Sequence, residues 1–196
     1  FFIMLGLLLT LYSMSTDPDL LPGGWKSIPI DSEQVTLIRP YLDRNLPHLF
    51  PEIEQKGYEI SFAKLQIVNG MFIQLTINTS TTLSFELTLF VDQQNKITIS
   101  EINRLSQAKP IMGGFKWVSS MLFSTNDLYR LAKTIQKKMN LLVSKRGTVL
   151  VYRKQVVNGI KEHIVFRDSN QNIFSAVIIR RPYTLTDELI SAYQIY

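Results

Sequence analysis

The fold is decided by a seven-residue stretch, Lys154-Gln155-Val156-Val157-Asn158-Gly159-Ile160. An apolar segment precedes its Asn-Gly pair, and an alternating segment follows it. Asn and Gly both tolerate positive φ, which a two-residue type I′ turn requires, so the stretch predicts a tight β-hairpin. Nearly the same phrase occurs earlier, as Leu65-Gln66-Ile67-Val68-Asn69-Gly70-Met71. One Asn-Gly hairpin is common, but the repeated Gln-(Ile/Val)-Val-Asn-Gly phrase indicates a duplicated unit.

A second pair of landmarks supports the duplication. Two similar segments each contain Gly-Gly followed by an aromatic residue and Lys, namely Leu21-Pro22-Gly23-Gly24-Trp25-Lys26-Ser27-Ile28 and Ile111-Met112-Gly113-Gly114-Phe115-Lys116-Trp117-Val118. These segments are 90 residues apart, and Gln66 and Gln155 are 89 residues apart. Because both landmarks give the same period to within one residue, we interpret the chain as two tandem homologous domains, residues 17–108 and 109–196.

Each repeat has the pattern of a short strand, one helix and two hairpins. In the second repeat, Ser124-Thr125-Asn126-Asp127 supplies an N-cap and an early acidic residue for a helix with one apolar face. That face is formed by Leu128, Leu131, Ala132, Ile135, Met139 and Leu142. In the first repeat the helix begins near Asp31-Ser32-Glu33, and Pro40 and Pro47 predict a kinked or shortened helix. Strands are expected at residues 25–30, 59–68, 71–79, 83–91 and 96–102, and at 115–119, 148–157, 160–167, 173–181 and 189–196. The predicted class is α+β.

The first eleven residues are almost wholly apolar, and Ser13, Ser15 and Thr16 follow them. A core strand, a membrane anchor and a signal peptide all remain open for such a segment, although it is too short to span a bilayer. The small and polar residues after it favour a signal peptide over residues 1–16. We therefore expect a protein that is secreted or lies in the lumen of the endomembrane or lysosomal system, without stable membrane association after signal removal. Asn78-Thr79-Ser80 is then a candidate glycosylation site.

Charge and composition narrow the function classes. Residues 1–108 have a net charge of −4, and residues 109–196 have +9. The basic half lacks the interleaved aromatic platform of a nucleic-acid-binding protein, so nucleic acid is not an expected partner. There is no Cys, and the two histidines, His48 and His163, lie in different repeats, which argues against a thiol nucleophile and a metal site. We expect His163 to be a half-exposed strand residue, and we expect neither a cofactor nor enzymatic activity.

The order of Gly-Gly, helix, Gln-x-Val-x-Gly hairpin and second hairpin resembles the cystatins, including stefins and plant-type cystatins. This resemblance implies two tandem cystatin-like domains, each an antiparallel β-sheet wrapped around one α-helix. It also implies inhibition of papain-like cysteine proteases by a wedge that enters the active-site cleft. The wedge of the first domain would consist of Gly23, Gly24, Gln66, Ile67, Val68, Asn69 and Gly70. That of the second would consist of Gly113, Gly114, Gln155, Val156, Val157, Asn158, Gly159 and, in place of the usual Pro-Trp, Pro182 and Tyr183.

Two points stay open at this stage. The first repeat offers only Asp92-Gln93-Gln94-Asn95 as its second hairpin, without an aromatic residue, so one or both domains could inhibit. The alternative function is a non-inhibitory cystatin-fold protein that binds an acidic partner through its basic second half. A domain-swapped dimer formed through the hairpin is also compatible with the sequence.

Overall fold

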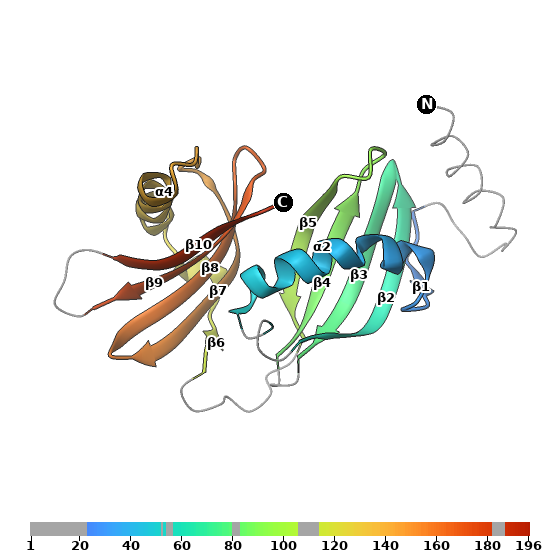
Figure 1. Cartoon of the computed structure of the whole chain (residues 1–196), viewed down its shortest axis with the longest axis horizontal. Helices are drawn as coiled ribbons and strands as arrows, with labels where there is room; N and C mark the ends of the chain where they lie inside the picture. Colours follow the sequence, from blue (N-terminus) through green and yellow to red (C-terminus); the bar gives the residue numbers. More distant parts are fainter. Residues whose placement is uncertain (1–22, 52, 54–56, 80–82, 106–113, 182–186) are drawn as a thin grey trace, which may run out of the picture.

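The computed structural model describes residues 23–51, 53, 57–79, 83–105, 114–181 and 187–196. These residues form two five-stranded antiparallel sheets, each accompanied by one long helix (Figure 1). The first unit contains β1 (Lys26–Ile28), α2 (Glu33–Leu49), β2 (Glu59–Val68), β3 (Gly70–Asn78), β4 (Ser84–Val91) and β5 (Ile97–Arg104). The second unit contains β6 (Lys116–Trp117), η1 (Ser120–Leu122), α4 (Thr125–Met139), β7 (Gly147–Val157), β8 (Gly159–Asp168), β9 (Ile173–Arg180) and β10 (Glu188–Ile195). The predicted α+β class is confirmed.

Both sheets have the same simple topology. The strands of the first sheet follow the order β1-β2-β3-β4-β5, and those of the second follow β6-β7-β8-β9-β10 across the sheet. Each long strand therefore pairs with its neighbours in the chain. The short first strand of each unit is the exception to the predicted lengths, because it spans only Lys26–Ile28 or Lys116–Trp117.

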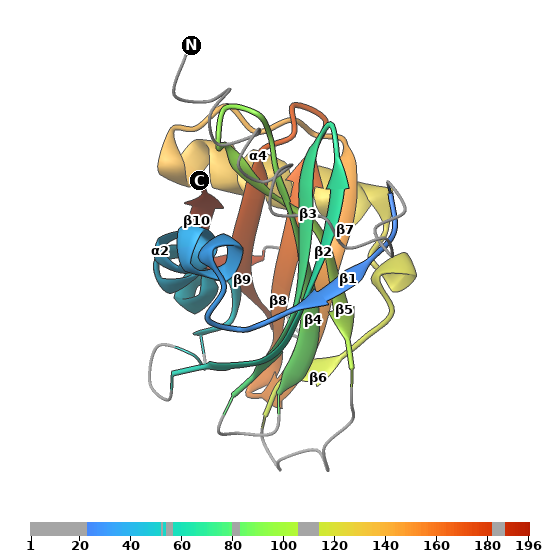
Figure 2. The same ribbon diagram turned by 90° about the vertical axis from the view of Figure 1, so that its right-hand side faces the viewer.

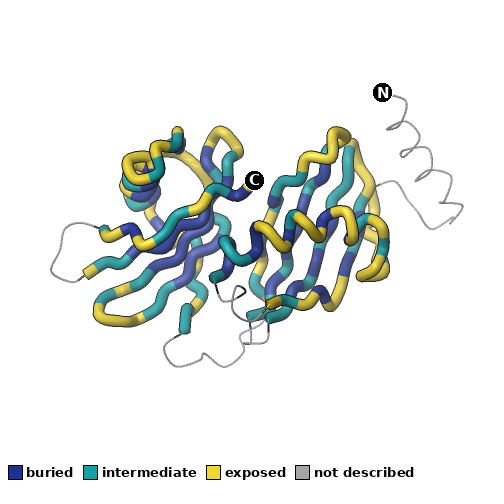
Figure 3. The backbone as a smooth tube through the Cα atoms, viewed as in Figure 1, coloured by how far each residue is buried: buried dark blue, intermediate teal, exposed yellow. Residues whose placement is uncertain are grey.

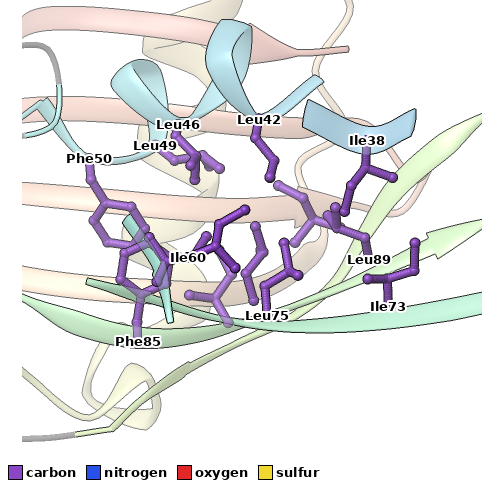
Figure 4. Close-up of a cluster of buried hydrophobic side chains, with 14 of the residues drawn as sticks. Ile38, Leu42, Leu46, Leu49, Phe50, Ile60, Ile73, Leu75, Phe85 and Leu89 are labelled. Atoms are coloured by element: carbon purple, nitrogen blue, oxygen red, sulfur yellow. The ribbon is translucent and has the colours of Figure 1, made fainter. Parts of the chain in front are cut away.

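Helix α2 lies across one face of the first sheet (Figures 1 and 4). It begins after Ser32, whose Oγ accepts a hydrogen bond from the Val35 N–H, as expected of an N-cap. The expected shortening is wrong: α2 has 17 residues, against 15 in α4, with both prolines inside it. Each proline costs about 3 kcal/mol in a helix interior. Each fully buried Val, Leu or Ile contributes about 1.5–3 kcal/mol, and five apolar helix residues are fully buried in the core between α2 and the sheet: Val35, Ile38, Leu42, Leu46 and Leu49.

Helix α4 covers one face of the second sheet. Its predicted N-cap is confirmed, because Ser124 Oγ accepts from the Asp127 N–H at 3.1 Å. Its buried residues Leu128, Leu131 and Ile135 face an apolar cluster on β7, β8 and β9. The expectation that Leu142 continues this stripe is wrong, since the helix ends at Met139 and Leu142 is 84% exposed.

The second sheet is buried on both faces, unlike the first (Figure 3). All six residues from Ile173 to Ile178 are buried, although a strand alternates its side chains between two faces. Alternate residues from β9 face α4, and the others face the first unit. The core of the first unit accordingly includes Val151, Val165 and Ile195 of the second. The first unit therefore covers the face of the second sheet that α4 does not cover.

Arg153 lies at the centre of this contact between the units. Its Cζ atom is 5.5 Å from the Phe50 ring centroid, 4.9 Å from Phe115 and 6.0 Å from Trp117. The aromatic rings offer their electron-rich faces to the guanidinium, which favours a buried cation. Because Phe50 follows α2 directly, this cluster joins the end of the first helix to the second sheet.

His163 lies in the same contact and corrects a prediction. It is fully buried, not half-exposed, because the first unit covers its face of β8. Its Nε2 is 3.1 Å from Ser175 Oγ, and its ring meets that of Phe50 edge-on. Burial lowers the pKa of His163 well below its usual value, and the charges of Arg153 and Lys161 lower it further.

Hydrogen bonds to backbone groups also join the units. The Arg167 guanidinium donates to the carbonyls of Ile99 and Ser100 on edge strand β5. Asn45 on α2 donates to the Tyr196 carbonyl at 3.0 Å and accepts from its N–H at 3.4 Å. These contacts pair backbone groups that a sheet edge or chain end otherwise leaves to water.

Candidate functional site

The two Asn-Gly hairpins connect β2 to β3 and β7 to β8. Val68 pairs with Gly70 and Val157 with Gly159, so a single asparagine occupies each apex. The glycines have φ of +124° and +118°, whereas neither Asn69 nor Asn158 has positive φ. The predicted hairpins are confirmed, but their predicted type I′ geometry is wrong, because that turn requires positive φ at both central residues.

The glycine after each apex asparagine lies against the backbone of the next strand. A Cβ on Gly70 would stand 2.6 Å from the Val91 carbonyl oxygen, and one on Gly159 would stand 2.8 Å from the Arg180 carbonyl oxygen. Real Cβ atoms essentially never lie this close to backbone, so a side chain at either position would force the backbone to shift. The same separation of 89 residues relates both the glycines and their carbonyl partners, so the two hairpins are equivalent in three dimensions as well as in sequence.

Three separate chain segments meet at the hairpin end of the first sheet. Gln66 Nε2 donates to the carbonyl of Gly23 at 2.5 Å, which ties the N-terminal segment to the first hairpin. Gln93 Nε2 donates to Asn69 Oδ1 at 2.5 Å, which ties the second hairpin to the apex of the first. We call this end the first edge, comprising Gly23, Gly24, Gln66 to Gly70 and Asp92 to Asn95. Ile67 and Val68 are exposed on it.

The second hairpin of the first edge is a well-ordered polar turn. Asp92 Oδ1 accepts from the N–H groups of Gln94 at 2.8 Å and Lys96 at 2.9 Å. Asn95 has φ of +61°, a conformation that asparagine adopts more readily than most residues. The predicted turn at these residues is confirmed, and it presents amide groups rather than an aromatic ring.

We call the equivalent end of the second sheet the second edge, comprising Gly114 and Gln155 to Gly159. Gly114 lies two residues before β6, whose Lys116 pairs with Lys154. Val156 is 81% exposed at the hairpin, and Val157 and Ile160 are also exposed. Three further predicted site residues lie outside the described residues: Gly113, Pro182 and Tyr183. The described chain reaches this edge at Arg181, whose Cα would be 3.6 Å from a Cβ on Gly159.

An ionic cluster lies directly behind the second hairpin and was not predicted. Glu162 is only 2% exposed, yet it pairs with Arg180 Nε at 2.8 Å and Lys154 Nζ at 3.3 Å. The Tyr152 hydroxyl donates to it at 2.7 Å, and burial together with this carboxylate raises the pKa of Tyr152. In the first unit the residues 89 positions earlier are Leu65, Ile73 and Val91, which are apolar and buried.

Arg180 extends this cluster to the start of helix α4. Its Nη1 is 2.9 Å from Asp127 Oδ1, and Asp187 lies 3.7 Å from its Nε. Burial opposes the ionisation of Asp127, but the Ser124 hydrogen bond and the charge of Arg180 hold its pKa below the usual range. A sequence signal for this cluster existed: charged residues occupy three positions at which the first repeat is apolar.

The candidate glycosylation site lies away from the first edge. Asn78, the candidate glycosylation site, ends β3 at the opposite end from Gly70 and accepts a hydrogen bond from Ser84 Oγ at 2.7 Å.

Within the described ranges, no group of three or more His, Cys, Asp or Glu residues is arranged to hold a metal ion. No helix in the described part of the chain has the length and apolarity needed to cross a membrane.

Comparison with protein-family models and with curated proteins finds no match to this chain. The geometry of the two edges is therefore what indicates the function.

Proposed function

We propose that this protein is a reversible inhibitor of papain-like cysteine proteases, built from two cystatin-like domains. The observation that carries the proposal is the convergence of three chain segments at the first edge, through the Gln66–Gly23 and Asn69–Gln93 hydrogen bonds. An N-terminal segment and two hairpin turns side by side are the elements that a cystatin-like wedge requires. The five-stranded sheet crossed by one helix, found twice, supports the same proposal.

The chemistry of the edges suits insertion into a narrow apolar cleft. Val68 and Val157, 42% and 43% exposed, would gain burial on docking. Apolar area removed from water contributes about 25 cal/mol per Å² to binding. The glycine that follows each apex asparagine adds no side-chain bulk, so that backbone can approach the cleft closely there.

The edge is also organised before binding. Strand pairing continues to the apex of both hairpins, and the two glutamine hydrogen bonds fix the neighbouring segments of the first edge. A preorganised surface loses little conformational entropy when it binds, which strengthens association. The hairpins place continuous paired strands, rather than an extended peptide bond, in front of the protease nucleophile, so the bound inhibitor resists cleavage.

Both edges contribute in this proposal. The first has Gly23 tied to its hairpin and a polar second hairpin, whereas the second has the more exposed apolar hairpin. A glycan on Asn78, in a secreted protein, would lie at the far end of the first sheet and leave the first edge accessible.

The test is a titration of papain with the full-length chain. We expect inhibition that weakens in the variants Val68→Asp and Val157→Asp, because each places a charge on one exposed apex. Leu142→Asp is the matched control, since it introduces the same charge at an exposed position outside the edges. The proposal fails if the wild-type chain does not inhibit papain at micromolar concentration, or if all three variants inhibit as well as wild type.

A further inference from the structure

We infer that one molecule of this protein holds two proteases at the same time, one on each edge. The inference rests on the proposed function and concerns its stoichiometry. Figure 1 shows the β2–β3 hairpin at the upper right of the molecule and the β7–β8 hairpin at the lower left. Figure 2, turned by 90°, again places the first hairpin at the top and the second at the bottom. The two edges therefore point away from each other.

The contacts between the units use other parts of both sheets. In the first unit they come from the end of α2 with Phe50, and from β5 through the carbonyls of Ile99 and Ser100. In the second unit they come from the central part of β7 and β8 and from the chain end at Tyr196. Packing of the units thus leaves the apex residues exposed on both hairpins.

The same contacts fix the direction in which each edge points. The interface between the units has apolar, cationic and hydrogen-bonded parts. It contains Arg153 among three aromatic rings, the buried His163 and the paired backbone of Tyr196. A flexible linker would let the edges swing together, and one protease would then block the other edge part of the time. A direct interface holds them apart instead, so the first protease bound does not obstruct the second.

The two sites are expected to be occupied independently, because neither hairpin contacts the other. They also differ in what supports them. Apolar residues lie behind the first hairpin, and the Glu162 ion-pair cluster lies behind the second.

The experiment measures the mass of complexes between the full-length chain and catalytically inactive papain, by size-exclusion chromatography with light scattering. The wild-type chain and Leu142→Asp are expected to saturate at two papain molecules. Val68→Asp and Val157→Asp are each expected to saturate at one, and the double variant is expected to bind none at the same concentrations. Circular dichroism of each variant checks that it is folded.

The outcomes separate the two proposals. Saturation of the wild-type chain at one papain, with inhibition retained, overturns the bivalent arrangement and leaves the inhibitor function standing. Saturation at two that persists in both single variants overturns the assignment of the sites to these hairpins. Absence of both complex and inhibition overturns the proposed function itself.

Discussion

The ionic cluster behind the second hairpin gives the sharpest test of how this fold is stabilised. Glu162 is almost wholly buried between two cations, whereas Ile73 occupies the equivalent place in the first unit. Replacing it by glutamine, Glu162→Gln, keeps its size and an acceptor for the Tyr152 hydroxyl, but removes the charge that Arg180 and Lys154 share. Removing one partner of a buried ion pair costs about 3–5 kcal/mol. Both cations keep some exposure to water, so we expect about 3 kcal/mol.

The first unit supplies a matched rescue for this loss. The triple variant Lys154→Leu, Glu162→Ile and Arg180→Val copies Leu65, Ile73 and Val91 into the second unit. Apolar replacement of a buried ionic triad is commonly neutral or stabilising, by about 1–4 kcal/mol. Asp127 keeps its hydrogen bonds with Ser124, and Asp187 keeps Arg130 at 3.1 Å. We therefore expect the triple variant to be at least as stable as wild type.

Urea denaturation followed by circular dichroism provides the comparison, with the midpoint and slope of each transition measured separately. Glu162→Gln should lower the midpoint clearly, and the triple variant should restore it. The reasoning is refuted if Glu162→Gln unfolds at the wild-type midpoint, since a buried carboxylate between two cations cannot then be stabilising the unit. It is also refuted if the triple variant is less stable than Glu162→Gln.

Three further predictions follow from single residues. Gly159→Ala should lower the melting temperature more than Gly57→Ala does. Both glycines have positive φ, but of the two only a Cβ on Gly159 meets a backbone carbonyl. Equal decreases in melting temperature would contradict the close approach at Gly159. Gln66→Ala removes the hydrogen bond to the Gly23 carbonyl, so papain inhibition should weaken several-fold while the melting temperature stays nearly unchanged. Full inhibition by this variant would show that the Gln66–Gly23 hydrogen bond does not contribute to binding. The depressed pKa of His163 means that the unfolded chain binds a proton more readily, so stability should hold above about pH 6.5 and fall progressively below it. His163→Gln, which introduces the residue of the equivalent first-unit position, should flatten this part of the melting-temperature profile, and an unchanged slope would contradict the assignment.

The sequence located nearly every element of this protein. The long strands lie within one or two residues of the predicted ranges, and both helices begin within the predicted starting stretches, Asp31 to Glu33 and Ser124 to Asp127. These features depend on local signals: alternating apolar residues, asparagine and glycine at turns, and serine before a helix. The repeat of 89 or 90 residues then showed that the same local plan occurs twice.

Local sequence patterns predict the wrong structure where distant residues decide the outcome. Local propensity indicated a disrupted first helix, but side chains buried against the sheet hold it continuous through Pro40 and Pro47. The asparagine at each hairpin apex was expected at positive φ, yet only the glycine adopts it, where it packs against the neighbouring strand. Neither the partner strand nor the sheet face is visible in a seven-residue pattern.

The hairpin at Gln155 to Gly159 shows which features the sequence determines and which the tertiary structure decides. Its sequence alone determined that a turn occurs there, that a copy exists at Gln66 to Gly70, and that valine and glycine accompany both. Tertiary structure decided that the two hairpins point in opposite directions, that Glu162 is buried with its cations behind one of them, and that His163 is enclosed by the other unit. Strand alternation specifies two faces of a sheet, but only packing between the units determines which of those faces meets water.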